Sequence, residues 1–496
     1  MGWPARRRPS WQGGVQVPPI TEKTRYYRTM AEAEARSLLA LRYMVDFRCI
    51  GGDCEDNCCH SGWAIYIDQE HLIQLRRLLP RTAASAADAA SSAPGSAPAA
   101  ERLPSFDEAV TMLPKSERSE RAYAQLRLDA SGTCPLLGEG GLCRLHARHG
   151  EAALPDTCAT YPRQLSRVGR RLELSGSLAC PEIARRCLLP ADGTDLVPAD
   201  LSLSARGQLQ QTAPAAAGVS AEQAHRHLDV VRGAMVRLLS LPEYPLSSRL
   251  FFTAFLAHKC ANVRRQPNGV LDPDAFLQQA TMLSHPEALA ELDRRLRESL
   301  ATAPLPLALL LSLLRHQRRV PGGQVFSALI VEIADSYRQL GGGSASEPGG
   351  SADAADAAEA ADLGGNARID VAYQDRRRAI EAAFPEHLER YFFNYARHFW
   401  MKEWYTSSPS LAVHTQGFLA RVALLRFTLL SHPEALAATQ AAAREEGGAR
   451  LDKLAVRVFY ALSRTLEHSG GYRSVLASEV QAKAAGLPDA ISLLAV

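Results

Sequence analysis

The stretch Phe47-Arg-Cys49-Ile-Gly-Gly-Asp-Cys54-Glu-Asp-Asn-Cys58-Cys59-His60 holds four of the ten cysteines of this 496-residue chain. Thiolates four or five residues apart on a glycine-bearing loop can turn inward onto one centre, so the stretch predicts a metal or iron–sulfur site. A disulfide framework is the competing interpretation, but it suits short secreted domains that cannot build enough core. A chain of this length does not need one.

A second group of cysteines follows in separate segments: Cys134-Pro-Leu-Leu, Cys143-Arg-Leu-His146, Leu154-Pro-Asp-Thr-Cys158-Ala-Thr-Tyr-Pro-Arg163 and Leu178-Ala-Cys180-Pro-Glu182. Two groups allow either two centres or one shared centre, and spacing alone does not decide between them. One tetrahedral zinc needs only four ligands, so the surplus of thiols favours a cluster. The predicted ligands are Cys49, Cys54, Cys58, Cys59, Cys134, Cys143, Cys158 and Cys180.

Other metal-binding residue types near these segments have a simpler interpretation. His60 and His146 stand beside cysteines, but four thiolates already suffice, so both are expected to support the site or to lie on the surface. Cys187 follows the second group, and the sequence leaves open whether it is a ligand or a buried side chain. Cys260 stands alone in a helical stripe and is expected to be a small buried hydrophobe.

The composition is that of an ordinary globular protein, with 46% hydrophobic and 22% charged residues. A net charge of +3 gives no electrostatic argument for nucleic-acid binding. The basic first residues lead into no apolar export signal, so we expect a reducing, cytoplasmic location. The longest apolar stretch, 304–314, is shorter than the roughly 20 residues that cross a bilayer, so it predicts a buried helix and no contact with a membrane.

Periodicity and low-complexity segments predict an α+β fold that is predominantly α. We expect a disordered tail at 1–30, a cysteine-rich metal or cluster module at 31–190, a linker at 191–219 and a helical region at 220–496. The module should hold a short helix at 33–43 and a strand at 62–68. Helices are expected within 379–404, 418–430 and 451–466. The segments 82–100 and 341–365 are read as flexible insertions.

The order of these motifs resembles the flagellin lysine-N-methylases, a branch of a family of cysteine-cluster proteins that chelate zinc or iron. The opening cysteine stretch, the Leu-x-Cys180-Pro-Glu182 element and the helix Leu388-Glu-Arg-Tyr391-Phe-Phe-Asn394-Tyr395 carry the resemblance. It implies a methyltransferase that moves methyl from S-adenosylmethionine to lysine ε-amines of flagellin, its protein substrate. It also implies an iron–sulfur centre, 4Fe-4S by type, or zinc.

The sequence itself does not show how the methyl donor binds, because no G-x-G-x-x-G follows a strand. A lysine ammonium has no lone pair, so methyl transfer needs a base or a desolvated pocket that lowers its pKa from about 10.4. Asp53, Glu55 and Asp56 lie among the first cysteines and Glu182 follows Cys180; any of them could orient the amine or act as this base, although a solvated or backbone-bonded role is the more ordinary one.

Candidate catalytic residues adjoin the cysteines or share one helix face. Tyr161 and Arg163 follow Cys158, and Arg163 could hold a carboxylate such as that of the donor. On the helix, a polar and aromatic stripe with Asn394, His398 and Lys402 could line a pocket or pack on a neighbour. The candidates are Tyr161, Arg163, Glu182, Tyr391 and Tyr395. The alternative function is a non-catalytic zinc- or iron-binding protein, or a redox sensor.

Overall fold

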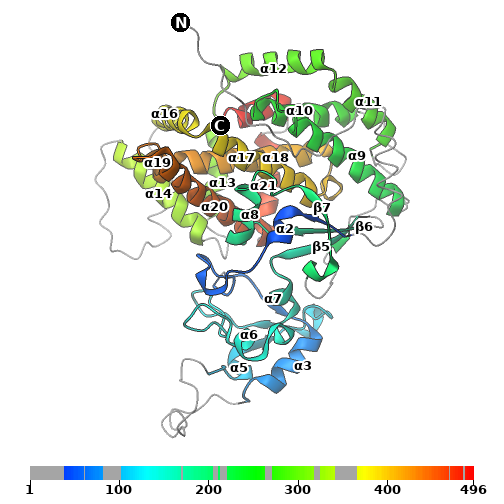
Figure 1. Cartoon of the computed structure of the whole chain (residues 1–496), viewed down its shortest axis with the longest axis vertical. Coiled ribbons are helices and arrows are strands. Elements are labelled where there is room, and N and C mark those ends of the chain that lie inside the picture. Colours follow the sequence, from blue (N-terminus) through cyan, green and yellow to red (C-terminus); the bar gives the residue numbers. More distant parts are fainter. Residues whose placement is uncertain are drawn as a thin grey trace.

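The computed structural model describes residues 38–60, 62–81, 102–168, 171–204, 211–212, 221–262, 271–317, 324–340, 366–468, 470–483 and 486–496. The predicted tail at 1–30 and the insertions at 82–100 and 341–365 lie outside these residues. The described part is predominantly helical with two small sheets, as the α+β expectation requires. Figure 1 shows a large helical body and a smaller lobe that holds α3, α5, α6 and α7.

The larger sheet joins distant segments in the order β7-β1-β6-β5-β8. Its strands are β1 (Leu38–Leu41), β5 (Arg163–Val168), β6 (Arg171–Gly176), β7 (Leu196–Ala199) and β8 (Gln211–Thr212). The helix expected at 33–43 was wrong over β1, because residues 38–40 pair in parallel with β6 and this tertiary pairing overrides local preference. Within the segment 191–219, predicted as a linker, the described residues include β7 and β8, which pair with β1 and β5.

The smaller lobe is built on a three-stranded sheet in the order β2-β4-β3. Strand β2 (Tyr66–Ile67) falls inside the predicted strand at 62–68, and β3 (Val110–Met112) and β4 (Ala124–Leu126) complete the sheet. Around it lie α3 (Gln69–Leu78), α5 (Phe106–Ala109), α6 (Arg144–His149) and α7 (Asp156–Thr160). Its core runs from Ile65 to Ala159 and is separate from the core of the helical body.

The region predicted to be helical after residue 220 is helical throughout its described part. The expected helix at 379–404 is divided at Phe384, because Pro385 begins a new helix where its missing N–H costs nothing. The helices are α9 (Ala221–Leu239), α10 (Leu246–Lys259), α11 (Pro273–Leu283), α12 (Pro286–Leu300), α13 (Leu307–Gln317), α14 (Gln324–Leu340), α16 (Asn366–Ala383), α17 (Pro385–Lys402), α18 (Leu411–Ser431), α19 (Pro433–Ala438), α20 (Arg444–His468), α21 (Gly470–Lys483) and α22 (Leu487–Leu494).

Helix α18 is the central helix of this region. Buried side chains occur around its whole circumference, and it packs against α10, α16, α20 and α22. The apolar stretch at 304–314 is the start of α13, where Leu310 and Leu313 are fully buried, so the expected buried helix is confirmed. No helix within the described ranges is both long and apolar enough to span a bilayer.

The larger sheet and the helical region share one hydrophobic core. A buried ion cluster reinforces this contact: Arg232 of α9 binds Glu173 of β6 through two hydrogen bonds of 2.7 and 2.8 Å. Two short helices, α2 (Arg42–Asp46) and α8 (Pro181–Leu188), connect the sheet to this body. Helix α8 packs against α17 and α20, so Cys180, which caps its first turn, lies at the junction between sheet and helices.

Candidate metal centre

The glycines of the first cysteine loop allow it to pack closely on a second turn. Gly51 has φ of +58°, and a Cβ at Gly52 would stand 2.6 Å from the backbone oxygen of Gly140. The side chain of Asn57 donates to the backbone oxygen of Gly141 in the same turn. This contact sets the first cysteine group beside the turn that leads into Cys143.

Hydrogen bonds then bring the two cysteine groups together. The backbone N–H of Cys134 donates to the carbonyl of Cys59 at 2.8 Å. The thiol of Cys59 hydrogen-bonds with the thiols of both Cys58 and Cys134. Cys143 and Cys158 pack against the same small-lobe core as Cys59. The charges of Cys134 and Cys143 also act on Cys59, so residues from three segments of the sequence lie near one another, while Cys158 packs against the same core.

Cys54 and Cys180 lie near Cys58, and Cys180 stands at the start of α8, which packs against the helical body. Burial, together with smaller contributions from the charges of Cys54 and Cys58, raises the pKa of Cys180 to about 12. Burial also raises the pKa of Cys54 to about 11, with Glu55, Cys58 and Asp56 adding to the effect. A charge on one of these sulfurs acts on the others only because they lie near one another.

The thiols of Cys54, Cys58, Cys59 and Cys180 are neutral near pH 7 without metal. The pKa of Cys58 is raised first by its hydrogen bond with Cys59 and then by burial, and that of Cys59 first by its hydrogen bond with Cys134. Since a metal binds the thiolate, binding at this site must release protons. All ten cysteines are free of disulfides, so none of these sulfurs is used by a covalent bridge.

The spacing of the sulfurs bears on the kind of group that fits. Four thiolates at about 2.3 Å from one zinc lie about 3.8 Å apart. Within the described ranges, Asp68, His71 and Asp156 place three potential ligand atoms within 4.8 Å of one another. The described cysteines form no group of three that close. The described thiols therefore do not form a closed four-thiolate zinc site as they stand.

The group of Asp68, His71 and Asp156 has a structural explanation. Asp68 is the N-cap of α3 and accepts the backbone N–H of His71 at 2.9 Å. It also accepts the backbone N–H of Asp156 at 3.1 Å and binds the ring Nδ1 of His71 at 2.8 Å. One carboxylate thus satisfies the first turns of two helices, α3 and α7.

The remaining cysteines and both histidines occupy distinct positions. Cys49 is exposed, and its sulfur lies 3.5 Å from the backbone nitrogen of Gly51. Cys260 is buried with 3% of its surface exposed, which confirms its expected role as a small hydrophobe, and Cys187 is fully buried. His60 bonds to Thr133 through its ring Nδ1, and the side chain of His146 is exposed.

Tyr161 and Arg163 lie beside the cysteines, as their place after Cys158 suggests. The Tyr161 ring is 5.3 Å from that of Trp63, and burial followed by the charge of Cys180 raises the pKa of its hydroxyl. The guanidinium of Arg163 lies over the ring of Phe47 at 5.1 Å, and burial lowers its pKa. The charges of Cys49 and Cys180 act on the same guanidinium.

The acidic candidates are held by arginines. Glu182 pairs with Arg185 and, at 2.6 Å, with Arg186, and Arg185 also pairs with Glu55. Asp56 pairs at 2.6 Å with Arg464 of α20. Arg464 was not identified from the sequence. The sequence offered one signal for it, since Arg464 stands among the mostly apolar residues of the helix predicted at 451–466.

The polar stripe of α17 contacts neighbouring elements along its length. Tyr391 donates to Asp452 of α20, and Asn394 donates to the backbone oxygens of Leu188 and Pro190 that end α8. Further along, His398 bonds to Tyr43 at 3.0 Å, and Lys402 pairs with Glu467 at 2.7 Å. Tyr395 is buried against Phe418 and Phe459, and burial raises its pKa to about 12.

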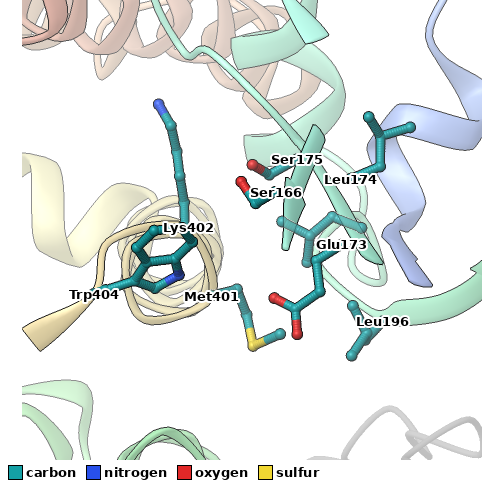
Figure 2. Close-up of a pocket in the computed structure, with 9 residues that line it drawn as sticks. Ser166, Glu173, Leu174, Ser175, Leu196, Met401, Lys402 and Trp404 are labelled. Atoms are coloured by element: carbon teal, nitrogen blue, oxygen red, sulfur yellow. The ribbon is translucent and has the colours of Figure 1, made fainter. Parts of the chain in front are cut away.

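A small cavity lies between this helix and the larger sheet. Figure 2 shows Met401 and Lys402 from the end of α17 opposite Ser166, Ser175 and Glu173 of the sheet. The cavity has a volume of about 10 Å³. That space holds about one water molecule and is far too small for S-adenosylmethionine.

A protein-family model described as the FliB lysine N-methylase C-terminal domain matches residues 232–493, more than half of the chain. The chain belongs to this family. The match covers the helical region from the middle of α9 to α22, and so includes α17, α20 and the contacts that they make with the cysteine segments.

Three curated proteins are similar to a part of this chain. The lysine-N-methylases of Salmonella choleraesuis and Salmonella typhimurium are each 28% identical over 171 residues, which is 34% of this chain and 35% of each relative. The flagellar biosynthetic protein FliU of Salmonella muenchen is 28% identical over 155 residues, which is 31% of this chain and 78% of FliU. The match thus spans about a third of the two methylases. No solved structure matches the chain.

Proposed function

We propose that this protein is a lysine N-methyltransferase that moves methyl groups from S-adenosylmethionine to lysine ε-amines of flagellin. Its cysteines would hold an iron–sulfur cluster of the 4Fe-4S type, or zinc. Family membership and the names of the relatives support a methylase with a flagellar connection. The observation that carries the metal centre is the gathering of free thiols from four segments at the junction with the family-matched helices.

The residues that would hold the centre are those whose sulfurs interact. Cys59 hydrogen-bonds with Cys58 and Cys134, and Cys54 and Cys180 lie within electrostatic reach. Bound iron and sulfide would supply one-electron chemistry, whereas bound zinc would supply fixed geometry or a Lewis acid. The surplus of thiols favours the cluster.

This chain's own residues would position the reactants. The half-buried guanidinium of Arg163 can hold the carboxylate of an amino-acid donor, because Phe47 fixes its plane and burial strengthens its hydrogen bonds. The buried Tyr161 hydroxyl stays protonated at neutral pH and can donate a hydrogen bond. A lysine side chain brought beside these buried groups would leave water, which lowers its pKa towards the neutral amine that attacks methyl.

The test uses the full chain purified without oxygen. Metal and acid-labile sulfide are measured first. The protein is then incubated with S-adenosylmethionine and unmethylated flagellin, whose peptides are analysed by mass spectrometry. We expect iron, sulfide and a gain of 14 Da or multiples of it on lysines, roughly the mass of each added CH₂.

Matched cysteine variants locate the centre. Cys58→Ala and Cys158→Ala should lose both metal and methyl transfer, because each removes a thiolate that the centre cannot replace. Cys260→Ala is the control, since that thiol is buried in the helical region and should leave the metal content unchanged. Metal without donor binding would instead support a non-catalytic or redox-sensing metal protein. Donor binding without flagellin methylation would reject the substrate alone.

A further inference from the structure

Arg464 belongs to the helical region, yet its guanidinium ends among the cysteine segments. Its Nη1 pairs with Asp56 Oδ1 at 2.6 Å. Its Nη2 donates to the backbone oxygen of Asp56 at 3.2 Å and to that of Ala179 at 3.5 Å. Asp56 stands between Cys54 and Cys58, and Ala179 directly precedes Cys180. One side chain therefore contacts both backbone segments that carry these three cysteines.

Aromatic rings pack against the Arg464 guanidinium, in addition to the hydrogen bonds that its nitrogens make. The rings of Trp63 and Tyr460 lie 5.1 and 5.8 Å from its central carbon. Only 3% of the Arg464 residue is exposed to solvent. A buried arginine stacked on aromatic rings keeps its charge and its orientation.

Among the described residues, the ion pair with Asp56 leaves one hydrogen-bonding atom unused on each partner. Arg464 Nε and Asp56 Oδ2 are buried and have no hydrogen-bond partner within the described ranges. Burying a pair of charges costs free energy that the pair alone often fails to recover. The buried Arg464–Asp56 pair is therefore poorly explained as a device that stabilises the fold. A further charged group beside Arg464 explains it better.

We propose that Arg464 is the counter-charge of the cysteine centre, a positioning residue whose guanidinium offsets the negative charge of the metal-bound thiolates. This inference rests on the proposed function, because it requires a metal centre. Four thiolates around Zn²⁺ carry a net charge of about −2, and an iron–sulfur cluster with four thiolates is also anionic. In a site shielded from water, a fixed cation beside such a group strengthens metal retention and raises the reduction potential.

The test compares three variants of the full-length protein purified without oxygen. Arg464→Met removes the charge and keeps an apolar side chain, and Arg464→Lys restores the charge without the planar fork. Arg457→Met is the matched control, because Arg457 lies two turns earlier on α20 and pairs with Glu332 of α14 at 2.7 Å. The readouts are metal and sulfide content, the rate of metal extraction by a chelator, the reduction potential of any cluster, and thermal unfolding.

We expect Arg464→Met to lose metal to the chelator about 10- to 100-fold more readily and to shift the reduction potential to a more negative value. Arg464→Lys should restore the potential and part of the retention, and Arg457→Met should match the wild type in both. If the centre proves to be zinc, it has no reduction potential to measure. The test is then whether Arg464→Met loses zinc faster than wild type and whether Arg464→Lys restores zinc retention.

Two results would overturn the inference while the proposed function stands. One is a loaded Arg464→Met protein with wild-type retention and potential. The other is an Arg464→Lys protein that retains metal no better than Arg464→Met. If Arg464→Met does not fold, loss of metal from a folded Arg464→Lys protein has the same meaning. In both cases the planar guanidinium, and not the charge, would be required. A wild-type protein that binds neither iron nor zinc would reject the proposed function together with this inference.

Discussion

Replacing Glu173 by glutamine tests whether the larger sheet and the helical region form one cooperative unit. Glu173 is 6% exposed and Arg232 is 4% exposed, so both charges are removed from water. Arg171 also contacts Glu173, and Asp229 binds both arginines. The change keeps the side-chain shape but leaves two guanidinium groups with one carboxylate.

The magnitude follows from the geometry of the pair. Opposite charges about 4 Å apart interact by about 4 kcal/mol at an effective dielectric constant of 20. Breaking one partner of a buried ion pair costs about 3–5 kcal/mol, and here two buried guanidinium groups would be left to share Asp229 alone. We therefore expect Glu173→Gln to lower the free energy of unfolding by about 3–5 kcal/mol at pH 7.

The dependence on pH gives this prediction a second readout. Burial opposes ionisation of Glu173, but Arg232 and Arg171 outweigh it and hold the pKa below its ordinary value. Such a carboxylate stabilises the folded state above its unfolded pKa of about 4.3, and the contribution is lost as the pH falls through the folded-state pKa. The difference between wild type and Glu173→Gln should therefore begin to shrink below about pH 4 and close as the pH falls through the lower folded-state pKa.

Equilibrium unfolding in urea, followed by circular dichroism and tryptophan fluorescence, measures the effect. Glu291→Gln is the control, because Glu291 pairs with Arg294 and Arg295 on the exposed face of α12 and should leave the midpoint nearly unchanged. A loss below about 1 kcal/mol for Glu173→Gln, or one equal to that of the control, would refute the reasoning.

Three further changes test local parts of the account. Gly52→Ala should loosen the cysteine loop and reduce metal content, because the added Cβ would stand 2.6 Å from the Gly140 oxygen; unchanged metal would contradict this packing. Asp68→Ala should cost about 1–2 kcal/mol in urea unfolding, since it removes an N-cap, whereas loss of bound metal instead would reveal a ligand. Asn394→Ala should cost about 2–4 kcal/mol, because two carbonyls at the end of α8 lose a buried donor; hydrogen exchange unaltered in α8 would argue against it.

The features that could be predicted from the sequence are those set by local pattern. Helical periodicity identified the region after residue 220, and Pro385, which begins α17, is a local signal that could have placed the helix break at Phe384. Cysteine spacing and the glycines of the first loop drew attention to residues that the structure brings together. These signals lie within a few residues of one another, so they are visible without a fold.

The features that the sequence did not reveal depend on contacts between distant segments. Strand β1 is a strand because it pairs with β6, more than 130 residues away, and the isolated segment reads as helix. Arg464 reaches Asp56 across 408 residues. The stripe on α17 suggested a pocket, but whether Asn394 faced a ligand or the end of α8 depended on where α8 packs.

The central claim is that the gathered cysteines hold a metal centre required for lysine methylation. It is tested most directly by one experiment on protein purified without oxygen: metal and sulfide content and mass spectrometry of flagellin lysines, measured together for wild type, Cys58→Ala and Cys260→Ala. The account predicts metal and methylated lysines for wild type and Cys260→Ala, and neither for Cys58→Ala. Methylated lysines in metal-free protein, or in Cys58→Ala, would contradict it.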